Sequence, residues 1–276
     1  TISTGAGNDS VWGGAGNDTI ASTAGTDTID AGSGDNTIDV SSIDSTISAG
    51  SGDDTVNVLE GSGSSFDLGD GDNVLAADVS VRAVLTGSGD DVIKLSGGHS
   101  DIYYEAASEG DWSYSSTWSR NWNTTQVNAG SGDDIITLSG TVELNRNYGD
   151  YSWVNGYGNA YGYIYGGDGN DTLDASNTTS VIELNGGNGD DIIYGAQEST
   201  ITISGGAGDD IIQSSKGQIA SNQWTSIDGG DGNDTITSST ALGVNENVIY
   251  GGNGNDIINA GDGHYKIYGD QNYNNN

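Results

Sequence analysis

Residues 186–213 read GGNGDDIIYGAQESTITISGGAGDDIIQ. The stretch holds two copies of a nine-residue pattern, Gly186–Tyr194 and Gly205–Gln213. Each copy places three glycines, an aspartate and a large aliphatic residue at fixed positions. Self-similarity at a fixed period predicts a solenoid, in which each repeat buries its apolar face only against its neighbours.

The same pattern, G-G-x-G-x-D-x-U-x with U a large aliphatic residue, recurs throughout the sequence. Other close copies are Gly13–Ala21, Gly166–Asp174, Gly229–Thr237 and Gly251–Asn259. Copies with Ala or Thr in place of the first glycine start at Thr4, Ala31, Ala49, Thr86 and Ala129. The copies at Ser22 and Leu68 are degenerate, and the copy at Ala260 has Tyr265 where the aspartate is expected.

This pattern resembles the nonapeptide of the repeats-in-toxin (RTX) family of secreted bacterial calcium-binding proteins, over nearly the whole chain. A dinucleotide site would require a helical pattern after the glycines, and no such pattern follows them. The resemblance implies an all-β, right-handed parallel β-roll or β-helix solenoid, which we expect to form a single domain over residues 1–276. In the family one coil comprises two nonapeptides, whereas most steps here are 18–24 residues with one glycine turn each. We therefore expect one main calcium row, with loop insertions on the opposite edge.

Apolar residues support this register. The eighth position of the pattern forms one column: Ile20, Ile38, Val56, Leu75, Ile93, Ile136, Leu173, Ile193, Ile212, Ile236 and Ile258. A second column lies two residues before each glycine turn: Ile47, Phe66, Val84, Val127, Ile164, Leu184, Ile203, Ile227 and Ile249. Two such columns predict short strands with one inward residue each.

The sixth position carries the candidate calcium ligands. They are Asp9, Asp18, Asp27, Asn36, Asp54, Asn73, Asp91, Asp134, Asp171, Asp191, Asp210, Asp234 and Asp256. Calcium binds six to eight oxygens, and glycine turns can aim successive carbonyls at one point. Eleven of these residues, all except Asp9 and Asp27, form the expected main row, which offers up to ten sites between successive turns. We expect about ten or more ions in all.

The family resemblance also implies backbone ligands. In the family, positions 2 and 4 of one turn and positions 1 and 3 of the next give carbonyl oxygens, together with both aspartates. Carried over, the carbonyl candidates are Gly14, Gly16, Gly166, Gly167, Asp168, Gly169, Gly186, Gly187, Asn188, Gly189, Gly205, Gly206, Ala207, Gly208, Gly229, Gly230, Asp231, Gly232, Gly251 and Asn253.

Some positions depart from this scheme. Asn36 and Asn73 supply an amide oxygen without charge, so we expect weaker sites there, for which Asp35 and Asp72 could compensate. Other acids at the fifth position, such as Asp53, are expected to be solvated surface charges. A second row, on the opposite edge, is supported only by Asp9 and Asp27.

Composition limits the function. Forty acidic residues against six basic ones give a net charge of −34, which argues against nucleic acid and anionic lipid as partners. No apolar run is long enough to span a membrane. Only 33% of the residues are hydrophobic, so a chain this acidic should stay disordered unless a cation offsets its charge. There is no cysteine, which suits an exported protein, and the missing initiator methionine suggests a processed chain or a fragment.

Two long insertions, at about 96–124 and 139–161, hold most of the aromatic residues. They could form a small satellite core, a contact surface or a platform for carbohydrate. The interface candidates are Trp112, Trp118, Trp122, Arg120, Arg146, Tyr151, Trp153 and Tyr157.

We expect no enzymatic activity, because the six scattered cations suggest no catalytic cleft. The sequence favours an extracellular, calcium-dependent structural protein that self-assembles as a surface layer, sheath or filament. The alternative is a folding and secretion module of a larger adhesin or exoenzyme exported by a type I system. Self-association is the expected partnership, with cell-surface polysaccharide as a second possibility.

Overall fold

The computed structural model describes residues 1–61, 63–79, 81–96, 126–140, 161–178, 180–196, 199–214, 225–239 and 247–270. These residues form an all-β parallel solenoid, and no helix occurs among them. The described part therefore contains no helix of the length and apolarity that crossing a membrane requires. The predicted parallel β-solenoid is confirmed, while its right-handed winding and its single-domain organisation stay predictions.

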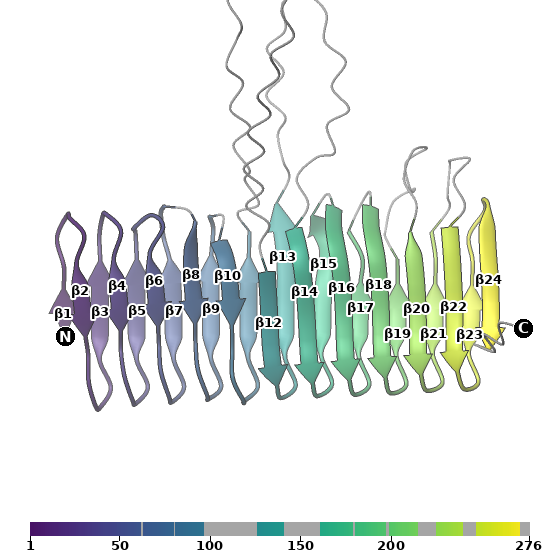
Figure 1. The fold of residues 1–276 in the computed structure, drawn as a ribbon, viewed down its shortest axis with the longest axis horizontal. Coiled ribbons are helices and arrows are strands. Elements are labelled where there is room, and N and C mark those ends of the chain that lie inside the picture. Colours follow the sequence, from purple (N-terminus) through teal and green to yellow (C-terminus); the bar gives the residue numbers. More distant parts are fainter. Residues whose placement is uncertain are drawn as a thin grey trace, which may run out of the picture.

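The solenoid consists of two 12-stranded parallel sheets that face each other (Figure 1). The first sheet contains the odd-numbered strands β1 (Ile2–Ser3), β3 (Thr19–Ser22), β5 (Thr37–Val40), β7 (Thr55–Val58), β9 (Val74–Ala77), β11 (Val92–Leu95), β13 (Ile135–Gly140), β15 (Thr172–Thr178), β17 (Ile192–Tyr194), β19 (Ile211–Gln213), β21 (Thr235–Thr237) and β23 (Ile257–Asn259). The second sheet contains the even-numbered strands β2 (Ser10–Trp12), β4 (Thr28–Asp30), β6 (Thr46–Ser48), β8 (Ser64–Asp67), β10 (Val81–Leu85), β12 (Gln126–Ser131), β14 (Tyr161–Asp168), β16 (Ser180–Asn188), β18 (Ser199–Ala207), β20 (Ser226–Asp231), β22 (Asn247–Asn253) and β24 (Tyr265–Asp270).

The two predicted apolar columns set the register of the sheets. In the first sheet Ile193 pairs with Leu173 on one side and with Ile212 on the other. In the second sheet Ile203 pairs with Leu184 and Ile227. Both columns are buried along almost their whole length, because alternate side chains of each strand point into the space between the sheets.

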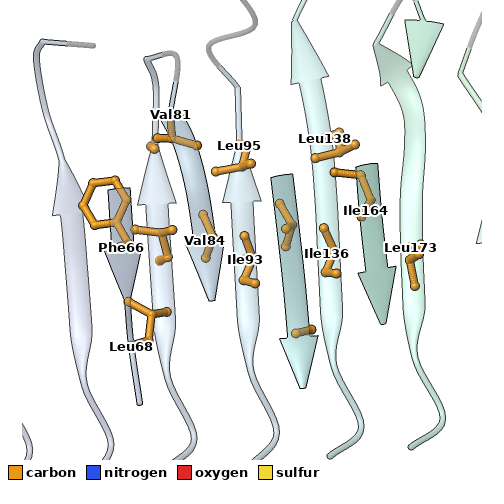
Figure 2. Close-up of a cluster of buried hydrophobic side chains, with 14 of the residues drawn as sticks. Phe66, Leu68, Val81, Val84, Ile93, Leu95, Ile136, Leu138, Ile164 and Leu173 are labelled. Carbon is orange, nitrogen blue, oxygen red and sulfur yellow. The ribbon is translucent and has the colours of Figure 1, made fainter. Parts of the chain in front are cut away.

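A third column makes the core wider than the sequence predicted. Strands β5, β7, β9, β11 and β13 each bury a second side chain two residues after the first: Val40, Val58, Ala77, Leu95 and Leu138. The expectation of one inward residue per strand is therefore wrong for these strands. Figure 2 shows Leu95 and Leu138 beside the first-column residues Ile93 and Ile136, with Phe66 and Val84 from the facing sheet.

Two kinds of connection alternate along the chain. The turns that lead from an even-numbered to the next odd-numbered strand form the lower edge in Figure 1, which we call the glycine edge. The connections that lead from an odd-numbered to an even-numbered strand form the opposite edge. Both long insertions fall there, since they follow β11 and β13 and precede β12 and β14.

Candidate metal centre

The glycine edge repeats one turn geometry. In the turn 205–210, Gly206 and Gly208 have φ values of 119° and 135°, which side chains rarely tolerate. A Cβ atom on Gly206 would also collide with the backbone oxygen of Gly187 in the preceding turn. The glycines at the second and fourth positions of the pattern are thus required for the backbone conformation and for the close stacking of successive turns.

The sixth-position residues of the main row form one continuous ladder. The backbone N–H of Asp191 donates to Oδ1 of Asp210 at 2.8 Å, and that of Asp210 donates to Oδ1 of Asp234 at 2.9 Å. The same bond, always from one coil to the side chain of the next, links all eleven members from Asp18 to Asp256, at 2.7–3.0 Å. The structure therefore brings together the neighbours that the sequence paired.

The second carboxylate oxygen of these aspartates is different. It is buried and accepts no hydrogen bond in Asp54, Asp91, Asp134, Asp171, Asp191, Asp210 and Asp234. A buried ionised oxygen without a donor or a cation is costly, so this arrangement is stable only if something positive reaches the oxygen.

Burial perturbs the acidity of the same groups. Burial raises the pKa of Asp134, Asp191 and Asp210 to about 7, and that of Asp171 to about 6. The charges of neighbouring aspartates add to this effect: Asp171 and Asp91 raise the pKa of Asp134 further. A row of carboxyl groups whose charged form is this disfavoured needs either protons or cations to fold.

The backbone of the turn can supply the remaining oxygens. A Cβ atom on Gly205 would collide with Oδ2 of Asp210 and with the carbonyl oxygen of Gly229 in the next turn, so glycine leaves a space between two oxygens. The same holds at the first glycines Gly166, Gly186, Gly229 and Gly251. Carboxylate and carbonyl oxygens are the ligands that calcium prefers, so these residues fit the ion.

The third-position carbonyls are partly occupied. The carbonyl oxygen of Asp231 accepts the N–H of Gly208 at 2.7 Å, and that of Ala207 accepts the N–H of Gly189 at 2.6 Å. Asp168, Asn188 and Asn253 accept in the same way. A carbonyl oxygen has two lone pairs, so each keeps one for a metal ion. Within the described residues no three His, Cys, Asp or Glu side chains converge on one point, and an ion here would depend mainly on carbonyls.

Asn36 and Asn73 lie in the same row, but their second atom is a donor. Nδ2 of Asn36 donates to the carbonyl oxygens of Gly34 at 2.7 Å and Ala49 at 3.3 Å. Nδ2 of Asn73 donates to the carbonyl oxygens of Gly71 at 2.9 Å and Gly69 at 3.2 Å. At these two turns an N–H donor points at the carbonyls that would face an ion, where the aspartate turns present a carboxylate oxygen, so the residues do not fit calcium as the aspartate turns do.

The fifth-position residues form a second ladder on the outside of the turn. The N–H of Asp209 donates to Oδ1 of Asp190 at 2.7 Å, and that of Asp190 donates to Oδ1 of Asn170 at 2.7 Å. The bond recurs along the edge from Asn17 to Asn255 at 2.7–3.1 Å. These side chains are exposed, and they also cap the backbone of the next coil. Asp35 and Asp72 belong to this outer ladder, so they do not face the turns of Asn36 and Asn73.

The two candidate residues of the second row lie next to each other on the opposite edge. The N–H of Asp9 donates to Oδ1 of Asp27 at 2.9 Å. Oδ2 of Asp9 has no partner, but Oδ2 of Asp27 accepts a hydrogen bond from the hydroxyl of Ser22. Only Asp9 therefore shows the unsatisfied oxygen that marks the main row.

Beyond Asp27 the opposite edge uses neutral acceptors. The N–H of Asp27 donates to Oγ of Ser45 at 2.8 Å, and the N–H of Ser45 donates to Oγ of Ser64 at 3.1 Å. Near the other end, the N–H of Thr225 donates to Oδ1 of Asn247 at 2.8 Å. These acceptors were not predicted from the sequence, because serine and asparagine on this edge belong to no repeated pattern.

The interface candidates belong to the two long insertions. Trp112, Trp118, Trp122, Arg120, Arg146, Tyr151, Trp153 and Tyr157 all lie outside the described residues. Their role stays a prediction.

Comparison with known families agrees with this geometry. A model of the RTX calcium-binding nonapeptide repeat matches residues 1–29, 30–64, 163–177, 183–198, 202–218, 226–239 and 245–271. Together the matches cover more than half of the chain, so the chain belongs to this family of calcium-binding repeats, which is typical of secreted bacterial proteins. A comparison with curated proteins gave no match.

Proposed function

We propose that this member of the RTX calcium-binding repeat family is an extracellular structural protein, which folds on calcium and assembles end to end through its solenoid. The observation that carries the proposal is the match between the two end faces of the solenoid. The outer edges of β1 and β2 at one end, and of β23 and β24 at the other, pair with no described strand. Unpaired strand edges are templates for pairing with another chain.

The side chains at the two ends are complementary in register. If β1 and β2 of a second copy stack on β23 and β24, Ile2 extends the first column beyond Ile258, and Val11 extends the second column beyond Ile267. Ile267 is 49% exposed, so this stacking would bury an apolar side chain that one copy leaves in water.

An outward-facing column also continues across the junction. Tyr250 and Tyr268 stack with ring centroids 5.0 Å apart and an interplanar angle of 11°. In the stacked register Trp12, which is 70% exposed, would follow Tyr268 in the same column of the second sheet. Aromatic stacking adds about 0.5–1.5 kcal/mol per pair beyond burial. A head-to-tail contact of this kind does not close, so it builds a filament.

Electron microscopy of the calcium-loaded protein over a range of concentrations tests the proposal. We expect filaments that disappear when a chelator is added. The filaments of the Trp12→Asp variant should be shorter than those of the wild type. Leu59→Asp is the matched control, because Leu59 is 60% exposed but lies in the middle of the opposite edge. A calcium-loaded particle that stays monomeric at high concentration would overturn end-to-end assembly.

A second candidate function is a folding module of a larger exported protein. It is favoured by the row of buried, unpartnered carboxylate oxygens, which should keep the chain unfolded where calcium is scarce and fold it outside the cell. Both candidate functions include export by a type I system and the absence of enzymatic activity. A gene product with a further domain of different composition would favour this second function.

A further inference from the structure

The glycine edge contains two turns in which a side chain occupies the place of the ion. In the aspartate turns Oδ1 of the sixth residue accepts the amide of the preceding coil, and Oδ2 has no partner. In Asn36 and Asn73 the same amide bond fixes Oδ1, since it comes from the N–H of Asp18 at 2.9 Å and of Asp54 at 3.0 Å. The amide nitrogen must therefore take the position of the unsatisfied oxygen.

That nitrogen points at carbonyls of the ion-binding type. Asn36 donates to Gly34, at position 4 of its own turn, and to Ala49, at position 1 of the next turn. Asn73 donates to Gly69 and Gly71, at positions 2 and 4 of its own turn. Both amide hydrogens are thus used, and both bonds end on carbonyl oxygens of the turns, of which that of Gly69 also accepts the N–H of Gly87 at 2.8 Å.

A side-chain amide and a calcium ion exclude each other here. Each neutralises the mutual repulsion of converging carbonyl oxygens by placing positive charge between them. A bound ion would face the hydrogens of Nδ2 rather than a carboxylate oxygen, and it would have to break two hydrogen bonds to reach the carbonyls. The asparagine turns therefore lack the anionic ligand and place N–H donors at the carbonyls that an ion would use.

We propose that Asn36 and Asn73 replace the calcium ion in their own turns, and that this divides the solenoid into two parts with different calcium requirements. The inference rests on the calcium binding of the proposed function, but not on assembly. One part, residues 28–85, which we call the asparagine block, contains Asn36, Asp54 and Asn73 as its sixth-position residues. The other part, residues 161–259, which we call the aspartate block, contains only aspartates: Asp171, Asp191, Asp210, Asp234 and Asp256.

The two blocks should respond differently to calcium. The asparagine block has one main-row carboxylate between two neutral neighbours, and its largest core side chain, Phe66, is fully buried. The aspartate block stacks five carboxylates at successive coils, where each repels the next until cations arrive. The asparagine block should stay folded at calcium concentrations that unfold the aspartate block, and so provide a template on which the remaining coils form.

Counting bound ions tests the replacement directly. Native mass spectrometry of the calcium-loaded monomer should show one more ion in Asn36→Asp than in the wild type, one more in Asn73→Asp, and two more in the double variant. Asn170→Asp is the matched control: it adds the same charge to the same edge, but at the outer ladder, and should leave the count unchanged. If both variants bind as many ions as the wild type, the replacement is wrong.

The reverse substitution keeps the test decisive if these variants fail to fold. Asp210→Asn should bind one ion fewer and keep its β-sheet circular dichroism, because the new amide can donate to the carbonyls that the ion leaves. Asp210→Ala should lose the same ion and be less stable than Asp210→Asn. Equal stability of the two variants would contradict a role for the amide.

Hydrogen–deuterium exchange during a calcium titration tests the two blocks. We expect amides of residues 28–85 to remain protected at a calcium concentration at which residues 161–259 exchange, and Asn36→Asp with Asn73→Asp to remove this difference. Loss of protection in both blocks at one calcium concentration would overturn the division. A wild type that binds no calcium at all would instead overturn the proposed function.

Discussion

The glycine edge and the opposite edge belong to the same coils, but they satisfy the backbone in different ways. On the glycine edge the N–H of Asp191 donates to a carboxylate, that of Asp210, whose second oxygen is left buried without a partner. On the opposite edge the N–H of Asp27 donates to a neutral hydroxyl, that of Ser45. A carboxylate creates a need for a cation and hence for a fixed ring of carbonyls. A neutral acceptor creates no such need, so the connection can vary in length.

Removal of calcium should have the largest effect, because it should unfold the turns of the glycine edge. In excess chelator the unpartnered oxygens of seven aspartates of the glycine edge would carry uncompensated charge in buried positions, so most of the β-sheet circular dichroism should be lost. Adding calcium back should restore the spectrum cooperatively. An unchanged spectrum after chelation would contradict a calcium-dependent glycine edge.

Gly206→Ala should have the next largest effect, because it disrupts one turn of the glycine edge. Its φ of 119° strains any side chain, and the new Cβ would collide with the backbone oxygen of Gly187. We expect a loss of about 3 kcal/mol or more in the free energy of unfolding, measured by denaturant titration in saturating calcium.

The control for this variant lies on the opposite edge. Gly5 has no atom within 4 Å of an added Cβ, so Gly5→Ala should change the free energy of unfolding by less than about 0.5 kcal/mol. Equal losses in the two variants would mean that close stacking of turns does not distinguish the edges.

Asp210→Ala should destabilise the folded protein more than Asp9→Ala. The pair of variants compares the main row with the opposite edge. The first change removes a carboxylate shared by two turns and deprives the N–H of Asp191 of its acceptor, which alone costs about 1–3 kcal/mol. Asp9 lies in the first coil and is only partly buried. Calcium titrations followed by circular dichroism should show a larger rise in the folding midpoint for Asp210→Ala. A larger rise for Asp9→Ala would contradict the dominance of the main row.

A change of pH should act on the glycine edge alone, and in opposite directions with and without calcium. Burial raises the pKa of Asp134, Asp191 and Asp210 from the ordinary value of 3.8 to about 7. Between these values the folded chain without metal binds more protons than the unfolded chain, so its stability is full below pH 3.8 and declines as the pH rises towards 7. In chelator we therefore expect β-sheet signal to appear when the pH is lowered from about 8 to about 5.

With calcium the sign reverses, since protons compete with the ion for the same oxygens. The apparent calcium affinity should fall over this pH range, as isothermal titration calorimetry would measure. If acidification weakened folding in chelator as well, the buried carboxyls would not be responsible.

Ser45→Ala should have the smallest of these effects, and it tests whether the opposite edge contributes to calcium binding. The change leaves the N–H of Asp27 without its acceptor, at a cost of about 1–3 kcal/mol in the free energy of unfolding. The number of bound calcium ions should stay the same. Ser48→Ala, on the outward face of β6, is the control and should be nearly neutral. A lost ion in Ser45→Ala would show that the opposite edge also contributes to calcium binding.

The repeated pattern of the sequence was sufficient to predict the parallel solenoid and the stacking of its turns. The spacing of glycines and aspartates identified every member of the main row, and the two apolar columns gave the register that the strands have. This is possible because each coil contacts only its neighbours, so a local pattern is also a tertiary one. The third column escaped prediction, because Val40 and Leu138 lie just beyond the nine-residue pattern, at a position where other coils carry Ser22 and Ser214.

The sequence by itself determined which residue types stand at the sixth position, and the tertiary structure decided what each of them does. From the sequence Asn36 is a weaker ligand and Asp27 is a normal one. In the fold, a backbone N–H of the preceding coil donates to one side-chain oxygen of each residue, and the surroundings of the other terminal atom decide the outcome. Nδ2 of Asn36 donates to carbonyl oxygens, Oδ2 of Asp27 accepts a hydrogen bond from a hydroxyl, and Oδ2 of Asp210 accepts no hydrogen bond. The physical reason is that a hydrogen bond between coils orients the side chain, and that orientation depends on the stacked neighbour rather than on the residue itself.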